Sequence, residues 1–283
     1  MSTQVPRLLA GLVDDAAVFP PGSASLPDAI AAHREHRTSW YADLVGPLLV
    51  PASAVGALDG LPEGTVTGLI GDTGVAGVPA ALAGLAAAGI AVRQVEVAVA
   101  RRGEDPQPGL AALRGVLARH GDLDWYAELP LTFGLTAALD TLAEARASGE
   151  PVAAKFRTGG LAAELFPTPV ELAAVICACR DRALPFKLTA GLHHALRQID
   201  PETGFTHHGF GNVLAATLAA AGGAEVDAVA ALLADTDPVR VVEPARAVRD
   251  DDRPLWIGFG SCSVREPLTD LIRLGLVNGG FDR

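Results

Sequence analysis

Lysine is nearly absent from this chain of 283 residues, in which two lysines stand beside 20 arginines. Cysteine is also scarce, and the chain has no excess of positive charge. The three cysteines are too few for a disulfide framework, and Cys177 and Cys179 lie two apart in a helical pattern, where they point to different faces. The formal net charge is −11 and no basic patch is visible. We therefore expect no nucleic-acid partner, because binding to the phosphate backbone needs clustered positive charge.

Long apolar runs are missing as well. The run LLAGLV near the start meets Asp14 and Asp15 too early for a secretory signal, and the alanine-rich stretch 80–92 is too short to cross a bilayer. A hydrophobic content of 49% with 19% charged residues is typical of a folded, soluble protein. We expect a cytoplasmic protein with no membrane partner. No linker divides the chain, so residues 1–283 are predicted to form one domain, and a homo-oligomer is compatible with the sequence.

Short apolar runs alternate with alanine- and leucine-rich helical patterns along the chain. This alternation predicts an α/β protein, and the count and spacing of the runs favour a (β/α)₈ (TIM) barrel, which needs roughly 31 residues per unit. An open, doubly wound sheet is the alternative. The last gap between strands is about twice the usual length, which predicts a long insertion between strands 7 and 8; VRVVEP is a candidate extra strand within it. The predicted strands are 8–13, 46–51, 65–70, 92–99, 123–129, 152–157, 185–189 and 255–259.

The two lysines lie on neighbouring predicted strands and are expected to point into the barrel. Side chains alternate along a strand, so Lys155 shares a face with Arg157, and Lys187 shares a face with Thr189. The opposite faces carry Phe and Leu, which should meet the helices outside the barrel. We therefore place both lysines inside, near the C-terminal mouth, where barrel active sites occur.

The same test places acidic side chains inside the barrel. In the fourth predicted strand Gln94 and Glu96 face inward, and in the fifth Glu128 shares its face with Tyr126. Buried charges are costly, so these groups must pair with the lysines or face a substrate.

Lysine in an otherwise arginine-based protein indicates a need for a removable proton. Guanidinium stays charged, whereas an amine close to other cations in a dry cavity can have its pKa lowered enough to attack a carbonyl. Lys155 or Lys187 would then form a Schiff base. Two alternatives remain: a lysine that shuttles protons or holds charge without a covalent bond, and a pair of ion-paired lysines without a function.

A lysine on the sixth strand, another on the seventh and a carboxylate on the fourth resembles the class I aldolases of the deoxyribose-phosphate aldolase type. The resemblance implies that Lys155 forms the Schiff base, that Lys187 lowers its pKa, and that Glu96 helps to move protons. It covers the strand ends only. The fourth-strand acid is Glu where the family has Asp, and the long insertion has no counterpart in the family.

The segment IGFGSCSVREPLTDL is similar to the Gly/Ser-rich turn with which that family grips phosphate after its eighth strand. The resemblance implies that Gly258, Gly260 and Ser261 bind an anion ahead of a helix N-terminus. The seventh strand departs from the family, because LTAGLHH follows Lys187 in place of a Gly-Gly phosphate turn.

The insertion carries two histidine pairs, His193–His194 and His207–His208. They could act as general acids or bases or bind substrate, for which His194 and His208 are the first candidates; they could hold a divalent metal with nearby carboxylates; or they could be structural. The spacing HH-x₁₂-HH matches no established zinc motif. Two other histidines, His33 and His36, lie in a predicted surface helix and are expected in solvent.

Further candidates for substrate binding end other strands. Arg157 is the best clamp for a carboxylate or phosphate, with a salt bridge to Glu128 as the alternative. Asp15 and Thr189 lie at the expected height of the mouth. Asp14 and Asp15 could bind a substrate amine or hydroxyl, or a metal, or could instead cap a helix or loop. For Cys262 no base is identifiable, so it is not predicted to be a nucleophile.

Together these features predict a lysine-dependent (Schiff-base) lyase or aldolase that acts on a small anionic oxo compound, with no cofactor beyond the covalent lysine. A metal-dependent lyase, hydrolase or isomerase that uses the histidine pairs is the second hypothesis. A non-catalytic barrel that binds a ligand is the third.

Overall fold

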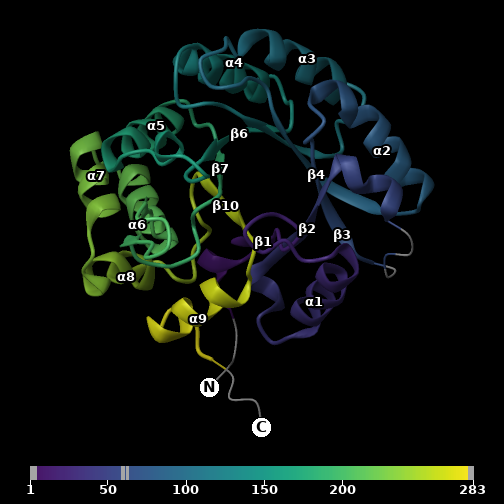
Figure 1. The fold of residues 1–283 in the computed structure, drawn as a ribbon. Helices are drawn as coiled ribbons and strands as arrows, with labels where there is room; N and C mark the ends of the chain where they lie inside the picture. The colour runs from purple at the N-terminus through teal and green to yellow at the C-terminus, as the bar shows by residue number, and fades with distance from the viewer. Residues whose placement is uncertain (1–4, 59–60, 62–63, 280–283) are drawn as a thin grey trace.

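The computed structural model describes residues 5–58, 61 and 64–279. Within these residues eight parallel strands close into a barrel in the order β1-β10-β7-β6-β5-β4-β3-β2, which confirms the predicted (β/α)₈ architecture (Figure 1). The barrel strands are β1 (Val13–Asp15), β2 (Val45–Pro51), β3 (Val66–Ile70), β4 (Ala91–Ala98), β5 (Asp124–Glu128), β6 (Val152–Arg157), β7 (Phe186–Thr189) and β10 (Trp256–Ser261).

Helices surround the barrel on its outside (Figure 1). Their apolar faces and the outward faces of the strands form one core, in which Val95 and Val97 of β4 are buried. The helices are α1 (Leu26–Thr38), α2 (Val78–Ala87), α3 (Gln107–Leu117), α4 (Leu135–Ala147), α5 (Pro169–Asp181), α6 (Phe210–Ala221), α7 (Val226–Ala234), α8 (Pro238–Ala247) and α9 (Arg265–Arg273). None of the helices in the described part of the chain has the length and apolar character that crossing a membrane requires.

The predicted insertion between the seventh and eighth barrel strands is present. It begins with a small hairpin of β8 (Gln198–Ile199) and β9 (Thr206–His207) and continues into α6, α7 and α8. Helix α7 packs against α5 and α6, and α8 packs against α6 (Figure 1). The candidate strand VRVVEP was wrong: it lies in α8, which Asp237 caps through Val239 N and whose buried residues Val241, Val242 and Ala245 follow helical spacing.

Two further expectations at the N-terminal side need correction. The first barrel strand is not 8–13: residues Arg7–Leu9 form a 3₁₀ turn, and the strand is Val13–Asp15. His33 and His36 are buried, not solvated. With Ala29 they form the inner face of α1 at the i, i+4, i+7 spacing. Because two of these three residues are polar, the sequence did not identify this face as buried.

Arg253 joins the start of the chain to the last barrel strand. Its guanidinium donates to the carbonyl oxygens of Leu8 (2.5 Å) and Ala10 (3.1 Å) on one side, and of Trp256 (2.7 Å) and Ile257 (2.6 Å) on the other. Because β1 pairs with β10, these bonds lie beside the seam at which the barrel closes.

We predict that Arg253→Ala lowers the free energy of unfolding by about 2–4 kcal/mol, because hydrogen bonds from a charged donor to half-buried carbonyls are lost. Urea unfolding measures this. Arg7→Ala, which removes an exposed ion pair to Asp252, is the control and should cost less than about 1 kcal/mol. If Arg253→Ala and Arg7→Ala lower the free energy of unfolding equally, Arg253 does not stabilise the junction between the start of the chain and β10 as proposed.

Candidate active site

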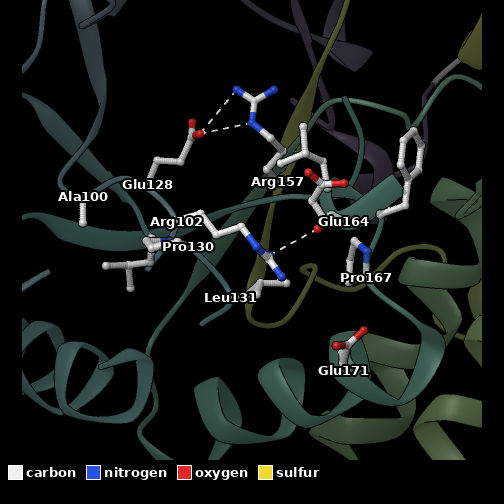
Figure 2. Close-up of a pocket in the computed structure, with 12 residues that line it drawn as sticks. Ala100, Arg102, Glu128, Pro130, Leu131, Arg157, Glu164, Pro167 and Glu171 are labelled. Carbon is white, nitrogen blue, oxygen red and sulfur yellow. Dashed lines mark hydrogen bonds and ion pairs between the residues drawn. The ribbon is translucent and has the colours of Figure 1, made fainter. Parts of the chain in front are cut away.

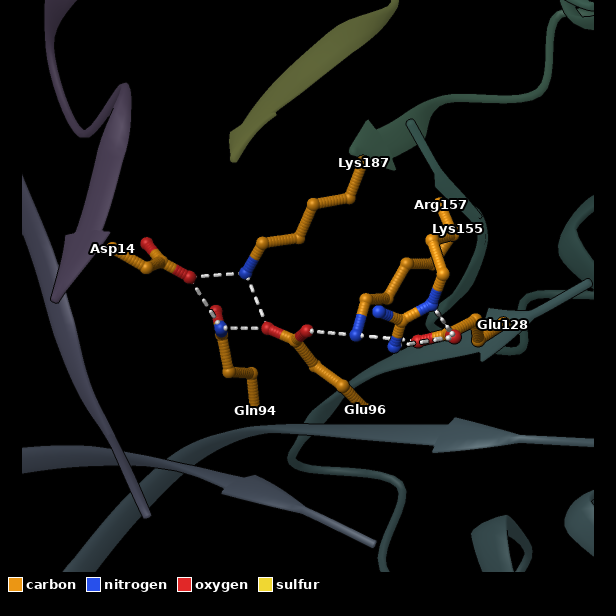
Figure 3. Close-up of polar contacts among 7 residues, drawn as sticks. All are labelled: Asp14, Gln94, Glu96, Glu128, Lys155, Arg157 and Lys187. Atoms are coloured by element: carbon orange, nitrogen blue, oxygen red, sulfur yellow. Dashed lines mark hydrogen bonds and ion pairs between the residues drawn. The ribbon is translucent and has the colours of Figure 1, made fainter. Parts of the chain in front are cut away.

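Six charged side chains of alternating sign form a row across the barrel interior (Figure 3). They come from β1, β4, β5, β6 and β7, so five strands contribute to one row. The order along the row is Asp14, Lys187, Glu96, Lys155, Glu128 and Arg157. Each charge has its opposite as neighbour, which is how a barrel can bury charges that would each be costly alone.

Strand register places three members of the row, Glu128, Lys155 and Lys187, side by side on neighbouring strands, whereas Glu96 lies two residues earlier along β4. Lys155 of β6 is paired with Glu128 of β5 on one side and with Lys187 of β7 on the other. The predicted inward direction of these side chains, and of Gln94 and Glu96, is confirmed by their mutual contacts.

The inner half of the row is centred on Lys187, which is 1% exposed. Its Nζ donates to Asp14 Oδ2, and to Glu96 Oε1 at 2.5 Å. Gln94 Nε2 ties the same two oxygens together, at 2.6 Å from Asp14 and 2.8 Å from Glu96 (Figure 3). The ammonium also lies 4.8 Å from the ring centre of Tyr126, a cation–π contact. Lys187 is therefore held from several sides.

The outer half of the row is centred on Lys155, which is 3% exposed. Its Nζ lies 2.8 Å from Glu96 Oε2 and 2.8 Å from Glu128 Oε2. The other oxygen of Glu128 meets Arg157 at 3.3–3.4 Å. Thus Glu96 binds one lysine with each oxygen, and Glu128 separates Lys155 from Arg157.

The pKa values of the two lysines contradict the expected activation by a neighbouring cation. Burial disfavours the ammonium, but Glu128 and Glu96 outweigh it and raise the pKa of Lys155. Asp14 and Glu96 raise the pKa of Lys187 in the same way. The amines are not left facing each other, because Glu96 lies between them. The resting site therefore holds two ammonium groups.

The carboxylates of the row differ among themselves. Burial opposes the ionised form of each, but Lys155 and Lys187 lower the pKa of Glu96 to about 2. Lys155 and Arg157 likewise lower the pKa of Glu128. For Asp14 burial prevails and the pKa is raised. Glu96 is thus a fixed charge, while Asp14 is the carboxylate most readily protonated.

A pocket of about 230 Å³ opens at the outer end of the row (Figure 2). Glu128 and Arg157 line it, whereas the two lysines lie behind them and do not. Arg102 also lines the pocket and donates to the carbonyl oxygen of Glu164 at 3.2 Å. The rest of the wall is mostly apolar, and includes Leu129, Pro130, Leu131, Leu165, Phe166 and Pro167.

The histidine candidates lie away from the row. His208 is buried between the carbonyl oxygen of Pro167, 2.7 Å from its Nε2, and Arg197, which is consistent with a structural role. His194 Nδ1 lies 3.2 Å from Asp270 Oδ2 on α9. Neither His194 nor His208 contacts a member of the row, and the described residues contain no group of three or more His, Cys, Asp or Glu arranged to hold a metal ion.

His193 turns toward Cys262, for which the sequence offered no base. Its Nδ1 lies 3.7 Å from Cys262 Sγ and 3.4 Å from Glu266 Oε2. Burial lowers the pKa of His193 and raises that of Cys262, so a thiol and a neutral imidazole are favoured. This pair lacks the charged form that a cysteine nucleophile needs.

Other candidate residues are distributed around the mouth. Asp15 points away from the row, with Oδ2 3.0 Å from His33 Nδ1. Thr189 is paired with Arg157 in the sheet and stays a prediction for substrate binding. Gly258, Gly260 and Ser261 lie within β10.

The expected Gly/Ser-rich turn therefore starts later than the sequence suggested. At Gly258 a Cβ would lie 2.6 Å from the carbonyl oxygen of Leu12, so glycine there permits close strand packing. Ser261 Oγ is buried and donates to the carbonyl oxygen of Ser263.

Three residues of the row, of its hydrogen bonds or of the pocket were missed as site members. Asp14 was noted together with Asp15 at the end of the first predicted strand, but only Asp15 was put forward for substrate binding; the predicted strand 8–13 stopped before both, so its alternation did not show which of them faces inward. Gln94 was placed inside without a role. Arg102 gave no signal, because it follows β4 in a polar loop whose path the sequence does not reveal.

Compared with known proteins, this chain matches no family model and no curated protein.

We predict that Glu96→Gln lowers the free energy of unfolding at pH 7 by about 3–5 kcal/mol, because it leaves two buried ammonium groups short of a partner. The pKa of Glu96 is about 2 when folded against 4.5 ordinarily, so its ionised form stabilises the fold above about pH 4.5 and loses that effect as pH falls toward 2. Urea unfolding of the wild type and of Glu96→Gln between pH 7 and 3 should show that the difference between their free energies of unfolding becomes smaller below pH 4.5. Glu144→Gln on the exposed face of α4 is the control. A difference in free energy of unfolding between the wild type and Glu96→Gln that does not change with pH would contradict this role of Glu96.

We predict that Gly46→Ala on β2 displaces Asp14, because the added Cβ would lie 1.9 Å from Asp14 Oδ1. The loss of the Lys187 contact and the crowding should cost about 2–4 kcal/mol in urea unfolding. Gly56→Ala is the matched control, since its Cβ would meet nothing within 4 Å. If Gly46→Ala and Gly56→Ala are equally stable, the added Cβ at position 46 does not displace Asp14 and the prediction is wrong.

Proposed function

We propose that this protein is a Schiff-base lyase of the class I aldolase type, which uses Lys155 to attack a small anionic oxo compound. One observation carries the proposal: Lys155 lies between two carboxylates, and one of them, Glu128, lines the pocket. Neither carboxylate partner of Lys187, Asp14 or Glu96, lines the pocket.

Lys155 must lose a proton before it can react, and Glu128 is placed to take it. The proton moves from Nζ to Glu128 Oε2 over a 2.8 Å contact, and the neutral amine then attacks the carbonyl carbon. The nitrogen passes a second proton to the former carbonyl oxygen. Glu128 returns its proton as the hydroxyl leaves as water. The net change is ammonium plus carbonyl to protonated imine plus water, with Glu128 ionised again.

Glu96 and Lys187 would hold charge during these steps. Glu96 Oε2 stays beside the nitrogen of Lys155, so it stabilises the positive charge of the imine. Lys187 keeps Glu96 ionised and prevents it from taking the proton itself. The pKa values of both carboxylates are lowered, but only Glu128 lines the pocket and has an exposed partner, Arg157. This difference supports a division of labour in which Glu128 moves protons and Glu96 does not.

Carbon–carbon cleavage follows from the same arrangement. The protonated imine accepts the electron pair of the bond between its neighbouring carbon and a carbon that carries a hydroxyl. Glu128 takes the hydroxyl proton, the hydroxyl carbon becomes an aldehyde or ketone, and the imine becomes an enamine. The reverse order of steps forms the bond.

The two other hypotheses are outcomes of the same test. A metal-dependent reaction through the histidine pairs has no donor cluster in the described residues to support it. A non-catalytic barrel would still need its row of charges for stability, but it would form no imine.

Borohydride trapping with a panel of oxo-acids and sugar phosphates, followed by peptide mass spectrometry, tests the proposal. We expect reduction to fix an adduct on Lys155, no adduct in Lys155→Arg, and trapping slowed roughly 10²-fold in Glu128→Gln, which lacks the base. Lys187→Met should still be trapped at Lys155, but more slowly. Glu144→Gln, distant from the site, should behave like the wild type.

The contrary results are equally definite. An adduct that persists in Lys155→Arg would assign the chemistry to another lysine. No adduct with any member of the panel, together with activity lost on chelation, would favour the metal-dependent hypothesis instead.

A further inference from the structure

Arg102 is an arginine of the pocket that forms no salt bridge with a carboxylate of the described residues, although its charge helps to lower the pKa of Glu171 across the pocket. It donates one hydrogen bond, from Nη1 to the carbonyl oxygen of Glu164, and makes no ion pair there. By contrast Arg114 and Arg182 are paired with Glu150 and Asp140. Most donors of the Arg102 fork are thus available to a ligand, and carboxylate or phosphate is the group that such a fork fits.

Most acidic groups of the pocket are already engaged. Glu171 accepts from the backbone N of Thr168 at 2.7 Å and from its Oγ1 at 2.8 Å, in the capping box of α5. Glu128 uses both oxygens, one on Lys155 and one on Arg157. Glu164 is the remaining acid. The uncommitted donors of the pocket therefore belong mainly to arginine, which favours an anion.

The contact between Arg157 and Glu128 is the longest and most exposed ion pair of the row. It measures 3.3–3.4 Å, against 2.8 Å for Lys155 and Glu128, and the side chain of Arg157 is 45% exposed. An incoming anion can take Arg157 at small cost, because a long and half-exposed ion pair contributes little.

We propose that Arg102 and Arg157 together hold the anionic end of the substrate, and that Arg157 releases Glu128 as it does so. This inference rests on the proposed function. Once its neighbouring cation is neutralised by the substrate, Glu128 becomes a stronger base, and the proton of Lys155 Nζ can pass to Glu128 Oε2. Substrate binding thereby activates the lysine that it is about to meet.

The same geometry names the class of substrate. It is a short oxo compound with a carboxylate or phosphate at one end, since the pocket holds only about 230 Å³, and with an apolar stem that can lie against Leu131, Leu165 and Phe166. A neutral oxo compound of the same shape would enter but would leave Glu128 on Arg157.

Matched pairs of probes separate these cases. Initial rates of borohydride trapping are measured for pyruvate against methyl pyruvate, and for dihydroxyacetone phosphate against dihydroxyacetone. The proteins are the wild type, Arg102→Met, Arg157→Met and Arg102→Lys. Arg101→Met is the matched control, because Arg101 is the neighbour in sequence and is exposed like Arg102, but does not line the pocket. The preferred anion, carboxylate or phosphate, is read from which pair shows the larger ratio.

We expect the wild type to trap one anionic probe at least 30 times faster than its neutral partner. Arg102→Met should lose about tenfold on the anionic probe and nothing on the neutral one, with Arg102→Lys in between. Arg157→Met should lose about tenfold on the anionic probe yet gain about threefold on the neutral one, because Glu128 is then free. A loss without that gain would refute the release of Glu128.

Equal rates for charged and neutral probes in the wild type, or an Arg102→Met variant that behaves like Arg101→Met, would overturn the clamp. If no probe gives an adduct, the proposed function fails, and calorimetric binding of pyruvate and dihydroxyacetone phosphate decides on the clamp alone. If the wild type binds either compound and Arg102→Met does not, the proposed anion binding by Arg102 and Arg157 is supported. No binding to the wild type, or equal binding by Arg102→Met, rejects it.

Discussion

The shared carboxylate of Glu96 is the interaction on which the site depends. Each of its oxygens binds one lysine, so a single buried charge fixes two ammonium groups on neighbouring strands. Without it the interior would hold cations that repel one another in a medium of low dielectric. The remaining members of the row complete the alternation, with Asp14 at the inner end and Glu128 and Arg157 at the outer end. Charge balance inside the barrel, rather than the presence of the lysines alone, makes the arrangement stable.

That balance changes how the lysines can be used. A cation next to Lys155 would have released its proton before substrate arrives, whereas the carboxylates keep the proton in place. In the proposed mechanism the neutral amine is therefore produced only when substrate binds, by proton transfer to a carboxylate whose own surroundings can change. Glu96 is unsuited, because two lysines lower its pKa to about 2. Glu128 has one exposed partner, Arg157, and so has surroundings that a ligand can alter.

Strand periodicity was enough to predict the barrel and the inward direction of Lys155, Lys187, Glu96 and Glu128, because alternation along a strand is a local property. Asp14 was harder, since the start of β1 decides which of two adjacent aspartates faces inward, and a preceding 3₁₀ turn moved that start. The order of charges along the row was also beyond the sequence. It depends on which long side chain reaches past its neighbour, and a Glu between two lysines reverses the shift of pKa expected for lysines in direct contact. Arg102, His193, His194 and His208 lie on loops, whose paths periodicity does not predict.

The two ends of the row are built differently, and this difference assigns their roles. The inner end is fixed: Gln94 bridges Asp14 and Glu96, the ring of Tyr126 lies beside Lys187, and Gly46 leaves no room for even a methyl group next to Asp14. The outer end is loose, because Arg157 is half exposed and its contacts to Glu128 are long. A catalyst needs a rigid part that maintains the electrostatic field and a movable part that responds to the ligand. Lys187 belongs to the first and Lys155 adjoins the second, which is why we propose the covalent role for Lys155 although the two lysines look alike in the sequence.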